Sequence, residues 1–397
     1  MNRNKVLIGV TGGIAVYKAL DLISQLRKKD IEVKVIMTES AQKFVSPLSF
    51  QALSQNMVTT DMFQEPKAWE IQHISLAKWA DLVIIVPATA NIIGKVANGI
   101  ADDMLSTTIM ASKAPVYFAP AMNTNMYVNP IVKGNIKKLK EYGYCFIDPA
   151  SGRLACGDEG QGKLAPVEEI LEVAVSVLNK SDDLEGKKIL VTAGPTISPI
   201  DPVRFITNRS TGKMGYAIAE EARDRGAEVI LVSGPTKIKP PYGIKVINVN
   251  TNEEMKSAVL DNFVTSDIVI KSAAVADYKI AQYSEKKIKK GEGNLNLEFV
   301  KDSDILKLLG EKKSDNQVLV GFAAESNDLI ENAKKKLVNK NLDLIVANDI
   351  TSTETGFASD ENKVILISKN DNIHLDKMSK REVAKKLFDE IKKIMDN

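Results

Sequence analysis

The sequence is poor in cysteine, histidine and aromatic residues, and each shortage excludes a class of protein. Its 397 residues include two cysteines, Cys145 and Cys156, two histidines and 6% aromatics. Two cysteines cannot form the disulfide framework of a small secreted domain. So few thiols and imidazoles also exclude an ordinary structural zinc site. These counts predict a cytoplasmic protein without disulfides.

An excess of either charge and a long apolar run are also missing. Lys and Arg total 53 against 51 for Asp and Glu, a net charge of +2, which argues against nucleic acid or an anionic membrane as the main partner. Uninterrupted apolar runs such as Leu82–Val86 are far shorter than the roughly 20 residues that span a bilayer. The first ten residues lack the apolar region of a signal peptide. We therefore expect a soluble enzyme that binds small molecules.

Short apolar runs alternate with helical patterns, which predicts an α/β fold with parallel strands and right-handed crossovers. The expected strands of the first half are Val6–Val10, Val33–Met37, Leu82–Val86 and Val116–Ala119. Between the first two, apolar residues recur every three positions, which predicts a helix whose apolar face carries Tyr17, Leu20, Ile23 and Leu26.

The pattern stops near residue 180 and then restarts. The polar segment Asn179–Gly186 is a plausible linker, and Lys187–Thr192 repeats the apolar opening of Lys5–Val10. Further strands are expected at Glu228–Val232, Lys245–Val249, Ile268–Ile270, Val318–Val320, Leu342–Val346 and Val364–Ile367, and helices at Lys213–Arg225, Asn327–Lys340 and Ser379–Met395. The Lys- and Gly-rich segment Tyr278–Leu297 is expected to be a mobile loop. We predict two tandem three-layer Rossmann-like domains, residues 1–180 and 187–397.

Three segments of the first half follow strands, where open α/β sheets bind ligands. They are Thr11–Lys18, Pro87–Asn91 and Ala119–Met126. Glycines at the start of a helix let backbone N–H groups approach an anion, and small hydroxyl and amide residues suit a flat ring. Each segment alone is also compatible with an ordinary turn, and neither a P-loop nor a Gly-x-Gly-x-x-Gly motif occurs.

The order of four motifs is more specific. Gln72–Asp81, Pro87–Asn91, Pro120–Asn123 and Ala155–Gly160 follow one another, and residues 5 to 175 thereby resemble the flavin-dependent cysteine decarboxylases, in particular those that act on phosphopantothenoylcysteine. The resemblance implies a flavodoxin-like fold with bound FMN, which oxidises the thiol-bearing carbon so that CO₂ can leave. It implies FMN contacts from Gly12, Gly13, Thr38, Thr89, Asn91 and Ala121.

The same resemblance assigns roles to three residues. His73 would be the base that helps to start the oxidation, and Asn123 would hold the substrate carboxylate. Cys156, in a Gly-rich flap, would donate the final proton. Cys145 lies in the apolar stretch Tyr144–Ile147 and is expected in the core.

The second half has its own motifs after the restarted strand. They are Ala193–Thr196, Asp201–Asn208 and Ser210–Gly215, the last of which leads into a helix and forms a possible anion cradle. An alternative is a helix that is merely well capped, with Ser210 as its N-cap.

A third group of motifs in the second half is positively charged. The run Lys286–Lys290 follows the strand-end segment Lys271–Tyr278, and it is by default a solvated surface. Lys336 and Lys340 are four residues apart on one helix face, where a polyphosphate would offset their repulsion.

Together these segments resemble the phosphopantothenate–cysteine ligases from residue 187 to 395. Fused behind a decarboxylase, they have the order of the bifunctional coenzyme A enzymes. The resemblance implies that the phosphopantothenate carboxylate attacks the α-phosphate of CTP, with Mg²⁺ screening the phosphates, and that the amine of cysteine then displaces CMP. Asn208 would contact the acyl-cytidylate and Lys287 the activated phosphate. The implied CTP pocket consists of Lys271, Ser272, Ala273, Asp277, Lys287, Val300, Lys301, Asp302, Ser303, Phe322, Lys336 and Lys340; no metal ligand is assigned.

Two other functions compete with this interpretation. A flavoprotein electron carrier fused to an unrelated domain would leave His73, Asn123 and Cys156 without a role. A regulatory flavoprotein would not need the catalytic residue types of both halves. The resemblance further implies decarboxylase trimers joined by ligase dimers, and hence a homododecamer.

Overall fold

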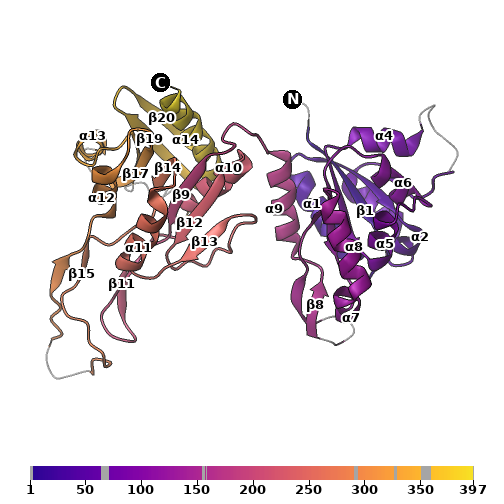
Figure 1. Cartoon of the computed structure of the whole chain (residues 1–397), viewed down its shortest axis with the longest axis horizontal. Coiled ribbons are helices and arrows are strands. Elements are labelled where there is room, and N and C mark those ends of the chain that lie inside the picture. Colours follow the sequence, from indigo (N-terminus) through magenta and orange to yellow (C-terminus); the bar gives the residue numbers. More distant parts are fainter. Residues whose placement is uncertain are drawn as a thin grey trace. The chain divides into compact units, whose positions relative to one another are not determined.

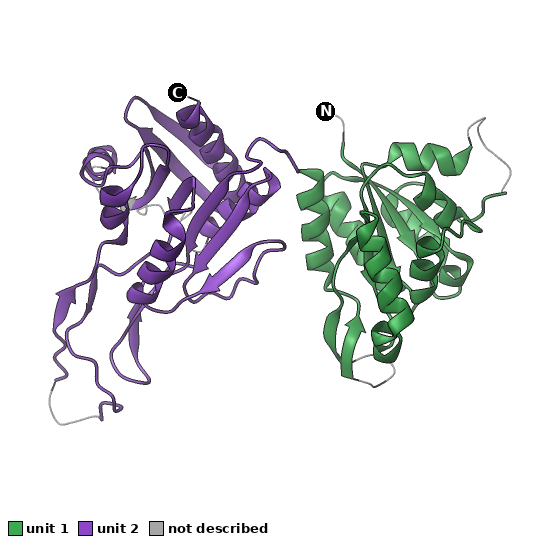
Figure 2. Cartoon of the chain, viewed as in Figure 1, with its two compact units in different colours: residues 1–179 green, residues 180–397 purple. Residues whose placement is uncertain are grey.

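The chain forms two compact units, residues 1–179 and 180–397 (Figure 2). The computed structural model describes residues 3–63, 71–153, 157, 159–289, 294–325, 329–349 and 359–396, without the side chains of residues 324, 325 and 349. Among the helices of these residues, none is long and apolar enough to cross a membrane.

The first unit is built on a parallel sheet with the strand order β3-β2-β1-β4-β5-β6 (Figure 1). Its strands are β1 (Lys5–Val10), β2 (Glu32–Met37), β3 (Val58–Thr59), β4 (Leu82–Ala88), β5 (Val116–Pro120) and β6 (Cys145–Phe146). Without the short edge strand β3, this is the strand order of a flavodoxin-like sheet. The order reverses between β1 and β4, and doubly wound sheets bind ligands beyond the carboxyl ends of the strands at such a reversal.

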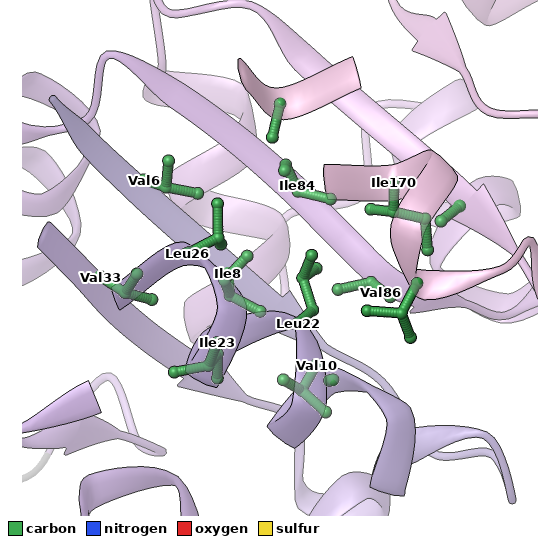
Figure 3. Close-up of a cluster of buried hydrophobic side chains, with 14 of the residues drawn as sticks. Val6, Ile8, Val10, Leu22, Ile23, Leu26, Val33, Ile84, Val86 and Ile170 are labelled. Atoms are coloured by element: carbon green, nitrogen blue, oxygen red, sulfur yellow. The ribbon is translucent and has the colours of Figure 1, made fainter. Parts of the chain in front are cut away.

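Helices cover both faces of this sheet. Helices α1 (Val16–Lys28), α3 (Pro47–Ser54) and α9 (Val167–Leu178) pack on one face, and α4 (Gln72–Trp79), α5 (Ala90–Ala97), α6 (Met104–Ala111) and α8 (Pro130–Glu141) on the other. The short helices α2 (Glu39–Gln42) and α7 (Thr124–Val128) follow β2 and β5. Figure 3 shows the first core, in which Leu22 and Leu26 of α1 lie over Ile8 of β1 and Ile170 of α9 lies near Ile84 of β4.

The second unit repeats this plan with a larger sheet of the order β13-β12-β9-β14-β17-β18-β19-β20. Its strands are β9 (Lys188–Ala193), β12 (Glu228–Ser233), β13 (Lys245–Asn248), β14 (Ile268–Lys271), β17 (Val318–Glu325), β18 (Leu344–Asp349), β19 (Glu361–Ser368) and β20 (Asn372–Ser379). Helices α10 (Lys213–Asp224) and α14 (Lys380–Met395) cover one face, and α11 (Asn252–Phe263), α12 (Ile305–Lys312) and α13 (Leu329–Asn339) the other. The order reverses between β9 and β14. The predicted pair of three-layer α/β folds is confirmed.

Among the described residues, three antiparallel ribbons lie outside the two sheets. The first unit has β7 (Ala150–Arg153) with β8 (Glu159–Lys163), and the second has β10 (Ile197–Pro199) with β11 (Phe205–Thr207) and β15 (Tyr278–Ile280) with β16 (Phe299–Lys301). In Figure 1 the ribbons of the second unit extend away from its sheet. The loop expected at Tyr278–Leu297 therefore begins as a paired strand. The hairpin strand β20 was missed because its polar sequence has no apolar run.

Several finer predictions are wrong. Tyr17 was expected on the buried face of α1 but is 59% exposed. In an α-helix, two side chains three residues apart differ in direction by about 60°. Tyr17 and Leu26 are three such steps apart, so they point to opposite sides of the helix. Cys145 is half-buried on the edge strand β6 rather than in the core. The N-cap of α10 is Gly212, with a φ of 83°, and not Ser210; only glycine adopts this backbone conformation without strain.

The segment between the units is attached to the second one. The backbone N–H of Ser181 donates to the carbonyl of Asp224, and that of Leu184 to the carbonyl of Arg225. Arg225 also pairs with Asp183 at 3.2 Å, and the side chain of Leu184 is buried in the core of the second unit. The predicted linker is thus bound to the rest of the second unit through Ser181, Asp183 and Leu184.

Candidate functional site

The reversal point of the first sheet is formed by the turns after β1 and β4. The buried Thr11 hydroxyl donates to the carbonyl of Pro87 at 2.6 Å and accepts from the backbone N–H of Thr89 at 3.2 Å. Both turns are thereby held together, and Thr89 is the N-cap residue of α5. Asn91, in the first turn of α5, is exposed. This places two predicted FMN residues at one edge of the sheet.

The remaining predicted FMN residues lie at the same edge. Thr38 caps α2 after β2, and its N–H donates to the carbonyl of Val10. Ala121 follows β5, and its N–H donates to the carbonyl of Ala88. A Cβ on Gly12 would lie 2.4 Å from that of Ser40, whereas one on Gly13 would meet nothing closer than 3.7 Å. Gly12 therefore permits a tight turn while Gly13 leaves open backbone. Small residues, hydroxyls and an open backbone at a reversal point fit a phosphate and a flat ring.

Asn123 lies beside the ribbon formed by β7 and β8. Its side chain accepts from the N–H of Asn125 at 2.8 Å and starts α7. The N–H of Met122 donates to the carbonyl of Gly162 at 2.9 Å, and a Cβ on Gly162 would lie 2.4 Å from the carbonyl oxygen of Met122. The Oγ1 atom of Thr124 is buried there without a hydrogen-bond partner. Cys156, expected in a Gly-rich flap, lies outside the described residues.

His73 lies apart from this arrangement. It is half-buried in the first turn of α4, and α4 packs against α6 through Leu76. Figure 1 shows α4 at the opposite end of the first unit from α7 and β8. Within one chain, Asn123 therefore follows β5 at the edge where the predicted FMN residues lie, whereas the helix that carries His73 lies at the other end of the unit from α7 and β8.

The reversal point of the second sheet is built in the same way. The Thr192 hydroxyl accepts from the N–H of Ala273 at 3.1 Å, and the Thr196 hydroxyl accepts from that of Ala276 at 3.2 Å. The Asn208 amide donates to the carbonyl of Ala274 at 3.1 Å. Asn208 and the predicted Lys271–Ala273 segment are therefore neighbours at the carboxyl edge of β9 and β14.

A charged cluster lies at the same edge. Lys271 is only 8% exposed. Desolvation lowers its pKa to about 8, against the opposing effects of the charges on Asp304 and Asp277, while Lys340 lowers the pKa further. Lys340 pairs with Asp304 at 2.7 Å, and the pKa of Asp304 is lowered because its hydrogen bonds to Lys340 and Lys307 outweigh desolvation. A buried ammonium whose pKa is depressed is a group that an anionic ligand would stabilise.

Other predicted nucleotide residues surround this cluster. The N–H of Asp302 donates to the carbonyl of Asp277 at 2.9 Å, which joins β16 to the segment after β14. The Ser303 Oγ is buried without a partner. Phe322 lies on β17, which pairs with β14. The further members are Ser272, half-buried, Val300 and Lys301 on the exposed strand β16, and Lys336, one helical turn before Lys340. Asp304 and Thr11 are not among the predicted site residues, although Thr11 opens the predicted binding turn, because a single carboxylate or hydroxyl carries no spacing signal.

Lys287 lies on the segment after β15 and is exposed. Its neighbour Ile288 is hydrogen-bonded through its backbone to Asp201 and Arg204. In the described part of the chain, no group of three or more His, Cys, Asp or Glu side chains is placed to hold a metal ion.

The fold defines an α/β protein of two compact units, each with a candidate ligand site at the carboxyl edge of its sheet. Residues 1–179 match the Flavoprotein family, and residues 184–395 match the family described as DNA/pantothenate metabolism flavoprotein C-terminal domain. The Coenzyme A biosynthesis bifunctional protein CoaBC of Bacillus subtilis is 53% identical over 395 residues, which cover 98% of this chain and 97% of that protein. Its counterpart in Escherichia coli K12 is 42% identical over 390 residues, or 98% and 96% of the two chains.

Solved structures are similar to each half. The C-terminal domain of a CoaBC protein is 44% identical, with a TM-score of 0.47, and covers 54% of this chain and 99% of its own. The FMN-dependent cysteine decarboxylase SpaF is 30% identical, with a TM-score of 0.39, and covers 44% and 97%.

The chain belongs to the family of coenzyme A biosynthesis bifunctional proteins. It is accordingly a flavoprotein enzyme with a decarboxylase half and a ligase half.

Proposed function

We propose that the second unit joins cysteine to 4′-phosphopantothenate with CTP and Mg²⁺, and that the first unit decarboxylates the product to 4′-phosphopantetheine. The observation that carries the ligase assignment is the buried Lys271 within the cluster of Asp304 and Lys340, next to the turn that holds Asn208. We also propose that the protein acts in the cytoplasm.

In the ligase half, the carboxylate of phosphopantothenate attacks the α-phosphate of CTP and pyrophosphate leaves. Lys271 and Lys340 neutralise phosphate charge, and Lys287 stabilises the phosphate that is attacked. The amine of cysteine then attacks the acyl carbon, CMP leaves, and one proton is released. Asn208 orients the acyl-cytidylate through its amide. Because no carboxylate cage occurs among the described residues, Mg²⁺ would be held largely by the phosphates, as is usual for this ion.

In the decarboxylase half, bound FMN supplies the two-electron chemistry. Six residues at the carboxyl edge of the first sheet would hold it: Gly12, Gly13, Thr38, Thr89, Asn91 and Ala121. Asn123 holds the substrate carboxylate, since its amide lies at the start of α7 beside β8. His73 removes a proton and Cys156 returns one.

The position of His73 supports assembly of the site between subunits. Helix α4, which carries His73, and helix α7, which Asn123 caps, lie at opposite ends of the first unit, so a second copy would have to supply one of the two residues. The two ribbons of the second unit expose Val203, Phe205, Tyr278, Tyr283, Phe299 and Val300. So many large apolar side chains on projecting strands suit an interface with a second copy. We propose decarboxylase trimers linked by ligase dimers, which close into a homododecamer.

The function is tested by mass spectrometry of the products formed from phosphopantothenate, cysteine, CTP and Mg²⁺. We expect 4′-phosphopantetheine, CMP and pyrophosphate. Accumulation of phosphopantothenoylcysteine would support the ligase half alone. Unchanged phosphopantothenate with either CTP or ATP would refute the ligase assignment, and sedimentation as an active monomer would refute the assembly.

A further inference from the structure

Asp201 is a buried carboxylate between two segments that are far apart in the sequence. It lies in the turn between β10 and β11 and is 3% exposed. Burial raises the pKa of Asp201, but hydrogen bonds from the backbone of Val203, Ile288 and Arg204 and from the Arg204 side chain outweigh it and lower the pKa to about 2. Asp201 is therefore an anion throughout the range in which the enzyme would work.

The two oxygens of Asp201 have different partners. Oδ1 accepts from the backbone N–H groups of Val203 and Arg204, both at 2.8 Å, and closes the local turn. Oδ2 accepts from the N–H of Ile288 at 3.1 Å and from the Arg204 side chain at 3.0 Å. The local turn needs only Oδ1, so Oδ2 serves the contact with Ile288.

Arg204 completes a clamp on the same residue. Its guanidinium pairs with Asp201 at 2.8 Å and donates to the carbonyl of Ile288 at 2.5 Å. Both backbone groups of Ile288 are thus bound by one ion pair. At the other end of this loop, the N–H of Ser284 donates to the carbonyl of Ile200 at 3.1 Å. The lysine loop, residues 284–289, is therefore fixed at two points to the segment that precedes β11.

We infer that Asp201 is a positioning residue for Lys287, holding the lysine loop so that the ammonium reaches the phosphate that is attacked. Ile288 is the next residue after Lys287, and a backbone clamp one residue away limits where an otherwise exposed lysine can reach. The chain also continues from Asp201 through β11 to Asn208. The Asp201 carboxylate therefore connects the segment that carries Asn208 to the loop that carries Lys287, the two residues proposed to contact the acyl-cytidylate and its phosphate. The inference rests on the proposed ligase function.

The experiment compares wild type, Asp201→Asn and the control Asp183→Asn in the full-length chain. Asparagine has the same shape as aspartate but only one acceptor oxygen. Both oxygens of Asp201 accept hydrogen bonds, so the NH₂ group of the asparagine in Asp201→Asn would face N–H donors and could not accept from them. Asp183 also pairs with an arginine, Arg225, but does not contact the lysine loop. Amide hydrogen exchange of the peptide that contains Ile288 measures the clamp. Pyrophosphate release from CTP and phosphopantothenate, without cysteine, measures the role of Lys287.

In Asp201→Asn we expect faster exchange at Ile288 and a fall in the single-turnover rate constant for pyrophosphate release of roughly 10- to 100-fold, the effect of a displacement of about 1 Å. The CTP concentration that gives half of the maximal rate constant should change less than about threefold, since most nucleotide contacts remain. Asp183→Asn should match wild type in both measurements.

Unchanged exchange at Ile288, or faster exchange with unchanged pyrophosphate release, would overturn the inference. If wild type itself released no pyrophosphate, the ligase function would fail, while the exchange measurement would still report on the clamp. Should Asp201→Asn not fold, Asp201→Glu keeps the charge and both oxygens but shifts the clamp by one methylene. It should lower pyrophosphate release at least about threefold, and wild-type release in Asp201→Glu would equally overturn the inference.

Discussion

At the scale of single residues, the second unit depends on a lysine that burial makes less basic. Lys271 has a pKa of about 8 because desolvation outweighs the attraction of Asp304 and Asp277. Since its pKa is lowered relative to the unfolded chain, protonated Lys271 opposes folding below pH 8. This penalty, on the order of 3 kcal/mol, is relieved as pH rises from about 8 to about 10.4.

The same shift predicts how nucleotide binding depends on pH. Below pH 8 the free protein already carries the ammonium, whereas above pH 8 binding of CTP must take up a proton. The Kd for CTP, measured by calorimetry, should rise by up to about tenfold per pH unit above 8. Lys271→Met should bind weakly at every pH, without this slope. Lys256→Met, which removes a lysine paired with Glu253, should keep the slope, and a slope retained in Lys271→Met would exclude this lysine as its source.

Thr11 is the comparable residue of the first unit. Thr11→Val removes the hydroxyl that joins the Pro87 carbonyl to the Thr89 N–H and leaves both groups without this partner. We expect a loss of about 1–3 kcal/mol in the free energy of unfolding and a higher Kd for FMN, measured by denaturation and by flavin fluorescence. Thr11→Ser keeps the hydroxyl and should retain most of both. Since Thr11→Val keeps the methyl group and Thr11→Ser keeps the hydroxyl, a loss in Thr11→Ser as large as that in Thr11→Val would contradict the assignment of the effect to the hydrogen bonds.

At the level of secondary-structure elements, the ribbon of β7 and β8 packs against the loop that carries Asn123, through the contact between Gly162 and Met122. Gly162 of β8 has a φ of 130° and lies against the carbonyl of Met122, whereas Gly152 of β7 has a φ of 144° and nothing within 4 Å of an added Cβ. Both glycines occupy backbone conformations that L side chains rarely adopt, but only one is enclosed.

This pair provides a matched test of the ribbon. Gly162→Ala should displace β8 from the Asn123 loop and lower the kcat for CO₂ release by about tenfold or more. Gly152→Ala shares the backbone strain without the clash and should have a much smaller effect. Pyrophosphate release by the second unit serves as the internal control for both variants. Similar losses of CO₂ release in the two variants would attribute the effect to strain rather than to displacement of β8.

At the scale of the whole molecule, the connection between the units belongs structurally to the second one. A fragment that begins at residue 180 keeps the Ser181 and Leu184 hydrogen bonds and the buried Leu184 side chain. A fragment that begins at residue 187 loses all of them. Burial of a leucine side chain contributes about 1.5–3 kcal/mol, so the shorter fragment should melt about 5 °C lower or more.

The comparison by scanning calorimetry needs one further variant. Leu184→Ala in the longer fragment should account for most of the difference in Tm. An identical Tm of the two fragments would mean that residues 180–186 do not stabilise the second unit.

The sequence determined the layout of both units because their signals are local. Buried parallel strands such as β1, β4 and β14 are continuous apolar runs, and glycines and hydroxyls directly after them predict binding turns. The antiparallel strand β20 and the exposed strand β16 escaped this reasoning, since paired polar strands have no apolar run. Tyr17 was assigned to the buried face for a different reason. The spacing of apolar residues predicts that a helix forms, but it does not by itself define which side of the helix is buried.

Which distant residues meet depends on the tertiary structure alone. Asp201 and Ile288, or Thr11 and Pro87, are joined by hydrogen bonds across more than 70 residues of sequence, and no local pattern encodes such a pair. The depressed pKa of Lys271 likewise arises from burial beside Asp304 and Lys340, which come from other elements. The residue types and their order are properties of the chain, whereas distance, burial and charge environment exist only once the sheets bring the strand ends together.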